Sequence, residues 1–139
     1  MLSSYIALLL IPSSFALLGI GSQQSVAVTG QLLCNGQPAS GIRIKLYDDD
    51  LTVDSKMDEQ YTNNAGVFTV SGSSREVTSI DPKINIYHKC NYYMLCYRKL
   101  SISIPSNYVS YGSTARTTYN VGTINLNNQF SGETIDCLN

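Results

Sequence analysis

The stretch Ile80-Asp-Pro-Lys-Ile-Asn-Ile-Tyr-His-Lys-Cys90 decides the fold of this 139-residue chain. Apolar and polar residues alternate after the turn set by Pro82. The core candidates occupy alternate positions of one parity and are Ile84, Ile86, His88 and Cys90. The other parity collects Lys83, Asn85, Tyr87 and Lys89. This period of two predicts a β-strand with one face in a core and the other toward solvent.

The first 21 residues contain no charged side chain and are predicted to be a secretory signal peptide. Their two apolar runs, residues 5–11 and 15–20, are separated by Pro12-Ser-Ser14 and are too short to span a bilayer, which takes about 20 apolar residues. Gly19 and Gly21 supply the small-x-small spacing that signal peptidase accepts. We expect residues 22–139 to form one secreted domain without a transmembrane segment; an uncleaved anchor is the alternative.

The four cysteines all follow this segment: Cys34, Cys90, Cys96 and Cys137. An even number of cysteines in an oxidising route favours two disulfides. Their spacing lacks the CxxC or Cys/His pattern of a metal site. The net charge of −1 predicts no global attraction to nucleic acid, so no nucleic-acid partner is expected.

Similar alternation predicts further short strands, over residues 26–34, 41–47, 67–71, 97–104 and 119–126. The parity of the last strand changes at Gly122, which predicts a β-bulge. The acidic residues 48–60 are predicted to be a loop and residues 72–76 a connector. Because no stretch after residue 21 keeps a helical period, the chain is predicted to be all-β, an antiparallel sandwich.

Six segments in order resemble the nematode transthyretin-like family. They are Val28-Thr-Gly-Gln-Leu-Leu-Cys-Asn-Gly-Gln-Pro-Ala39, Gly41-Ile-Arg-Ile-Lys-Leu-Tyr-Asp48, Thr62-Asn-Asn-Ala-Gly-Val-Phe68, Ser79-Ile-Asp-Pro-Lys-Ile-Asn-Ile-Tyr-His-Lys-Cys90, Ile104-Pro-Ser-Asn-Tyr-Val109 and Val121-Gly-Thr-Ile-Asn-Leu126. The resemblance covers nearly all of the chain after the signal, including the four cysteines. It implies a small secreted protein with a transthyretin-like (immunoglobulin-like) β-sandwich of about seven strands and two disulfides. Most members of that family have no established biochemical activity.

The resemblance also implies a topology and a disulfide pairing. In transthyretin-like sandwiches the first strand runs parallel to the penultimate or last one. Cys137 would then return to Cys34, while Cys90 and Cys96 would face each other across a five-residue connection. We therefore expect Cys34–Cys137 and Cys90–Cys96, with Cys34–Cys90 and Cys96–Cys137 as the alternative; bridged Cα atoms lie about 4.4–6.8 Å apart.

His88 is the obvious catalytic candidate because imidazole titrates near neutral pH. It shares the parity of Ile84 and Ile86, however, so we expect an inward-facing histidine satisfied by a hydrogen bond. The 5-hydroxyisourate hydrolases resemble the same fold but use several histidines, an arginine and a C-terminal Tyr-Arg-Gly-Ser. This chain has one histidine, ends Asp136-Cys-Leu-Asn139, and has no Gly-x-Ser-x-Gly. We expect no catalytic residue and no enzyme activity.

The acidic segment offers hard oxygen ligands of the kind that calcium prefers. Its members are Asp48, Asp49, Asp50, Asp54, Asp58 and Glu59. They lack the spaced D-x-D-x-D-G pattern with a terminal Glu, so a solvated loop is favoured over a calcium site. We expect neither a metal nor a cofactor.

A face rich in cations and tyrosines is the candidate binding site. In the transthyretin arrangement, strands 41–47 and 97–104 would flank the opening strand and share its outer face. Clustered cations attract anionic groups locally. The candidate residues are Arg43, Lys45, Tyr47, Lys83, Tyr87, Lys89 and Lys99. Either the face is merely solvated, or it binds a lipid headgroup, an acidic glycan or an acidic protein surface.

The predicted function is therefore that of a secreted binding or adaptor protein without catalysis. Its partner would be a cell surface, a lipid headgroup or an extracellular protein. The alternative is a carrier of small hydrophobic ligands, as transthyretin is, which requires a tetramer with a channel between subunits. A hydrolase is the third and disfavoured hypothesis.

Overall fold

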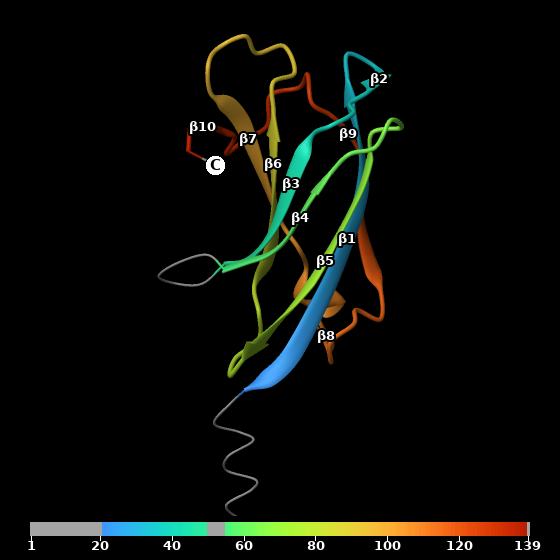
Figure 1. The fold of residues 1–139 in the computed structure, drawn as a ribbon, viewed down its shortest axis with the longest axis vertical. Coiled ribbons are helices and arrows are strands. Elements are labelled where there is room, and N and C mark those ends of the chain that lie inside the picture. The colour runs from blue at the N-terminus through green and yellow to red at the C-terminus, as the bar shows by residue number, and fades with distance from the viewer. Residues whose placement is uncertain (1–20, 50–54, 139) are drawn as a thin grey trace, which may run out of the picture.

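Two β-sheets packed face to face make up the computed structural model, which describes residues 21–49 and 55–138 (Figure 1). The first sheet, here the β1 sheet, contains β1 (Ser22–Cys34), β2 (Gln37–Pro38), β5 (Val67–Glu76), β8 (Ser110–Tyr111) and β9 (Thr118–Asn125). The second, the β6 sheet, contains β3 (Arg43–Asp48), β4 (Ser55–Tyr61), β6 (Pro82–His88), β7 (Tyr97–Ser103) and β10 (Thr134–Asp136). A short 3-10 helix, η1 (Ser106–Tyr108), precedes β8. The predicted all-β fold is confirmed.

The described part of the chain includes only Gly21 of the predicted signal peptide; residues 1–20 lie outside it. Within that part, no helix is long and apolar enough to cross a membrane.

Strand β1 is the centre of its sheet, antiparallel to β5 and parallel to β9. The parallel pairing agrees with the topology that the resemblance implied. The register of β1 and β9 shifts between Thr29 and Gln31, where two residues of β9 oppose Gly30. One of them is Gly122, whose φ of +83° is readily adopted only by glycine. The predicted bulge is confirmed.

The β6 sheet has the strand order β10-β7-β6-β3-β4, with every pair antiparallel. The opening stretch of the sequence supplies its central strand, as the strict alternation predicted. The inner faces of the two sheets meet in one apolar core. Fully buried residues there include Val26, Val28, Leu32, Phe68 and Val70 from the β1 sheet, and Ile44, Leu46, Ile84 and Ile86 from the β6 sheet.

The predicted loop over residues 48–60 is wrong in its second half, because residues 55–61 form β4. This strand lies at the sheet edge, pairs with β3, and contacts β5 through a hydrogen bond from the Ser71 amide to Asp58. Only Met57 among its residues packs partly against the core. The predicted connector 72–76 is also wrong, since β5 runs on to Glu76 and pairs with the start of β1.

The expected disulfide pairing, Cys34–Cys137 and Cys90–Cys96, is wrong. The structure pairs Cys34 with Cys90 and Cys96 with Cys137, with Cα–Cα distances of 5.8 and 4.5 Å. The reason is the path of the chain after β9. It leaves the β1 sheet and adds β10 to the edge of the β6 sheet, where Asp136 pairs with Tyr97, so Cys137 arrives beside Cys96. Cys34 and Cys90 then link the ends of β1 and β6 across the two sheets.

Candidate ligand-binding face

The three neighbouring strands β3, β6 and β7 place the predicted cations and tyrosines on one outer face. Cross-strand register gives three rows: Arg43, Tyr87 and Lys99; Lys45, Asn85 and Ser101; and Tyr47, Lys83 and Ser103. Lys89 follows β6 directly. The structure thus brings the candidate residues together on the β6 sheet, on the side away from the core.

This face is less open to solvent than the sequence pattern predicted. Tyr87 is only 4% exposed and Lys45 only 8%. Two cations of β3 lie over the Tyr87 ring, with Arg43 Cζ and Lys45 Nζ each 5.3 Å from its centroid. Such cation–π contacts hold long side chains flat against the sheet, and each contributes about 0.5–2 kcal/mol. Lys45 and Tyr87 are therefore the floor of the face.

Three cations of the face form ion pairs with carboxylates from flanking segments. Lys83 Nζ lies 3.6 Å from Asp49 and Lys99 Nζ 3.7 Å from Asp136. Arg43 lies 4.0 Å from Glu59 of β4, which Lys56 also contacts. Partly exposed pairs of this kind contribute at most about 1 kcal/mol each. They reduce the net positive charge that the sequence pattern predicted, because β4, β10 and the residue after β3 bring carboxylates to the face.

The pKa of the Tyr87 phenol is raised to about 12, chiefly because burial disfavours the phenolate. The hydrogen bond from Asn85 Nδ2, 3.3 Å from the Tyr87 oxygen, acts in the opposite direction but is the smaller effect. Asn85 is itself held by Ser101, whose hydroxyl lies 2.6 Å from Asn85 Oδ1. Tyr87 therefore remains a neutral phenol at physiological pH.

A hollow of about 360 Å³ opens where this face reaches the start of β3 and the end of β6. Its side chains include three tyrosines and two cations: Tyr61, Tyr87, Tyr97, Arg43 and Lys89. Lys89 Nζ lies 5.1 Å from the centre of the Tyr97 ring and donates to the carbonyls of Met94 and Leu95. Among the described residues, no carboxylate lies within ion-pair distance of Lys89. It is the cation of this face that combines exposure with the absence of an acidic partner.

Sequence reasoning missed Tyr61 of this hollow, and it placed Tyr97 on the outer face without including it among the candidate residues. Tyr61 ends β4, which was predicted to be loop, and Tyr97 begins β7. Tyr97 has the same parity as Lys99, and this signal was available in the sequence.

His88 faces inward as predicted and is 1% exposed. The Cys90 amide donates to its Nδ1 at 3.1 Å, while its Nε2 has no hydrogen-bond partner among the described residues. Burial, and then the nearby Arg98 guanidinium, lower the pKa of this imidazole to about 4. His88 is therefore neutral at physiological pH and enclosed by protein.

Arg98 was not recognised from the sequence, yet it has the most hydrogen bonds of any described side chain in this region. It is 5% exposed and pairs with Glu133. Its other donors reach the carbonyls of Cys90, Leu126 and Asn128 at 2.7–3.0 Å. Arg98 thereby fixes the chain between β9 and β10 and the disulfide end of β6. Its role is structural.

The acidic residues considered for calcium do not converge in the described part of the chain. Asp48 is buried and accepts from the Asp81 amide, Asp58 accepts from Ser71, and Glu59 pairs with Lys56. Asp50 and Asp54 lie outside the described residues. Among those described, no group of three or more His, Cys, Asp or Glu side chains is placed to hold a metal ion.

Comparison with known proteins gives one consistent family. Residues 29–105 match the family described as "TTR-52: Transthyretin-like family". The Caenorhabditis elegans Transthyretin-like protein 5 is 49% identical over 136 residues, covering 96% of this chain and 96% of that protein. Transthyretin-like protein 33 of the same organism is 41% identical, covering 92% and 94%. Among solved structures, a 9R-lipoxygenase from Cyanothece PCC8801 superposes on 74% of this chain and 16% of its own, with 18% identity and a TM-score of 0.42, which is too distant to support any argument.

Proposed function

The chain belongs to the transthyretin-like family, and on this premise we propose that it is a secreted binding protein without catalytic activity. Its ligand carries an anionic group that enters the hollow between Arg43 and Lys89. The observation that carries the proposal is the composition of this hollow, in which two cations and three tyrosines surround about 360 Å³.

The side chains of the hollow suit a phosphate, sulfate or carboxylate group. Lys89 has three donor hydrogens, and within the described part of the chain its partners are two carbonyls and a ring rather than a carboxylate. An anion can therefore approach it without displacing an ion pair. Arg43 adds a planar donor set, which is suited to paired oxygens. The tyrosines add phenolic hydroxyl groups, which can donate hydrogen bonds.

The same chemistry occurs on lipid headgroups, acidic glycans and acidic protein surfaces, so the test uses one probe for each. The oxidised chain of residues 22–139 is titrated with phosphatidylcholine vesicles with and without an anionic phospholipid, with heparin, and with polyglutamate. We expect binding to at least one anionic probe and none to vesicles of phosphatidylcholine alone. No binding to any of the three anionic probes overturns the proposal.

The variant that tests the site is Lys89→Glu combined with Arg43→Glu. Each cation near an anionic surface contributes on the order of 1 kcal/mol, so reversal of both should weaken binding by at least about tenfold. The matched control is Arg75→Glu combined with Arg116→Glu, which makes the same change in net charge at exposed positions of β5 and of the segment before β9. Equal weakening in the control would show that net charge, and not this hollow, determines binding.

A further inference from the structure

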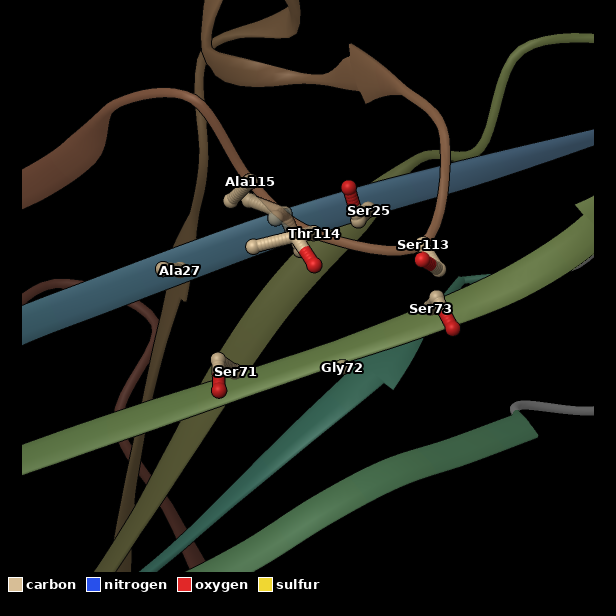
Figure 2. A pocket seen from close by; sticks show the side chains of 9 residues that line it. Ser25, Ala27, Ser71, Gly72, Ser73, Ser113, Thr114 and Ala115 are labelled. Atoms are coloured by element: carbon tan, nitrogen blue, oxygen red, sulfur yellow. The ribbon is translucent and has the colours of Figure 1, made fainter.

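A second hollow, of about 320 Å³, lies on the outer face of the β1 sheet, away from the cationic site. Strands β1 and β5 form its floor, and the segment between β8 and β9 forms its wall (Figure 2). Five hydroxyl side chains line it: Ser25, Ser71, Ser73, Ser113 and Thr114. We define this set as the hydroxyl hollow.

Strand pairing explains why hydroxyl groups gather at this place. Ser25 of β1 lies opposite Ser73 of β5 on one side and opposite Ser110 of β8 on the other. Ala27, two residues further along β1, lies opposite Ser71. Because residues two apart on a strand share a face, Ser25, Ala27, Ser71 and Ser73 point together to the side away from the core.

The wall is held over this floor at both of its ends. The Gly112 amide donates to the Gln23 carbonyl at 2.9 Å, and the Arg116 amide donates to the Ser110 hydroxyl at 3.0 Å. Between these two bonds, Ser113, Thr114 and Ala115 lie over β1 in Figure 2. The hollow is therefore built by anchored backbone on three sides.

The Ser25 hydroxyl is the feature that points to a ligand. Ser25 is 1% exposed, and its Oγ has no hydrogen-bond partner among the described residues. A buried hydroxyl without a partner costs free energy relative to one that is satisfied. Its neighbour Ser73 already accepts from Gln23 Nε2 at 2.8 Å but keeps its own hydrogen to donate.

The lining also restricts the chemical class of the ligand. It contains no charged side chain and no aromatic ring, so a charged group would lose its hydration here without gaining a counter-charge. The floor strands pair with each other, so they offer hydroxyls and not a free strand edge. Hydroxyl side chains both donate and accept, and the small side chain of Ala27 allows close approach.

From these observations we propose that the hydroxyl hollow is a binding site for an uncharged saccharide, with a sugar hydroxyl hydrogen-bonded to Ser25 Oγ. A sugar hydroxyl, like the serine side chain, can act as donor and acceptor in the same contact. The site is independent of the cationic one, because the two share no residue and lie on opposite sheets.

The experiment is an amide-shift NMR titration of the oxidised chain of residues 22–139. The probes are glucose, galactose, mannose and N-acetylglucosamine with their short oligomers, and glucuronate as the charged counterpart. We expect saturable shifts at residues 25, 71–73 and 113–115 with at least one neutral sugar. Shifts with glucuronate alone, or with no sugar at all, overturn the proposal; neither result bears on the anionic probes of the cationic site.

Ser25→Ala separates a ligand contact from a structural hydroxyl. Because the hydroxyl has no partner in the described part of the chain, its removal should leave the melting temperature unchanged or higher, while sugar affinity falls about tenfold. Thr118→Ala, which removes an exposed hydroxyl of β9 outside the hollow, should bind as the unmodified chain does. Ala115→Trp should fill the hollow and abolish the shifts. Unaltered sugar affinity in Ser25→Ala would overturn the assignment.

Discussion

The β6 sheet and the β1 sheet close one core, but they bury different kinds of polar group. The β6 sheet buries ionisable side chains, namely Lys45, Asp48, His88 and Arg98, together with the amide Asn85. The polar side chains that the β1 sheet buries are uncharged, namely Gln24, Ser25 and Ser110. The same difference extends to their outer faces, where one hollow is cationic and aromatic and the other contains only hydroxyl, small and apolar groups. One sandwich can thus present two faces of different chemistry, and we expect the stability of the β6 sheet, more than that of the β1 sheet, to depend on charge and pH.

The largest expected effect comes from removing Arg98. Arg98→Met should lower the free energy of unfolding by about 3–5 kcal/mol, because it leaves the Glu133 carboxylate and three carbonyls without their partner. Urea unfolding measures this loss. Arg75→Met is the control on the β1 sheet, where the guanidinium makes one long contact at an exposed position and should matter by less than about 0.5 kcal/mol. If both variants lost the same free energy of unfolding, the two sheets would not differ in their dependence on charged side chains.

The next effect tests the covalent link between the sheets. The double variant Cys34→Ser, Cys90→Ser opens a disulfide that spans 56 residues, and loop-closure entropy predicts a loss of about 4 kcal/mol. Native-state hydrogen exchange should show faster opening in β1 and in β6 together. Cys96→Ser with Cys137→Ser opens a bridge inside the β6 sheet, so the added exchange should remain in β7 and β10. Exchange confined to one sheet in the first variant would contradict the role of Cys34–Cys90 as the link.

The third effect is a pH dependence that belongs to the β6 sheet. The pKa of His88 is about 4 in the folded chain and near 6.5 when unfolded, so the unfolded state binds more protons between these values. Above about pH 6.5 His88 is neutral in both states and does not reduce the free energy of unfolding. As the pH falls toward 4, protonation of the unfolded state lowers the free energy of unfolding, by on the order of 3 kcal/mol at pH 4.

His88→Gln isolates this contribution because the carboxylates titrate in both proteins. The unfolding free energy of the unmodified chain minus that of His88→Gln should decrease as the pH falls from 8 to 4. Urea titrations at several pH values measure it. A difference that is independent of pH would mean that His88 accepts a proton as readily in the folded chain as in the unfolded one.

The alternation of apolar residues predicted the central strands of both sheets, because those strands have one face in the core. It missed β4 and β10 because edge strands bury little; among the residues of β4, only Met57 packs against the core. This single omission explains most of the errors about the site. The carboxylates of Glu59 and Asp136, which pair with Arg43 and Lys99, lie on the two missed strands.

Two further features depended on the path of loops, which no periodic pattern encodes. The disulfide pairing was set by the crossing of the chain from β9 to β10, which brings Cys137 to Cys96. The hydroxyl hollow was set by the segment after β8 that lies over Ser25. The parity of a strand cannot show that a segment distant in sequence covers Ser25.

The smallest expected effect tests the β1 sheet, in which the bulge of β9 requires a residue with positive φ. Gly122→Ala should cost about 1 kcal/mol, because the bulge holds φ at +83° and no atom lies within 4 Å of an added Cβ. The cost should be the same at pH 8 and pH 4, since no titratable group is involved.

Gly66→Ala is the matched comparison: its φ is similar at +76°, but an added Cβ would lie 2.3 Å from the Leu32 carbonyl oxygen. It should therefore cost clearly more than Gly122→Ala in thermal unfolding. Equal costs would mean that backbone conformation alone accounts for both positions, and a cost at Gly122 that grows toward pH 4 would mean that the β1 sheet also depends on the charges of its neighbour.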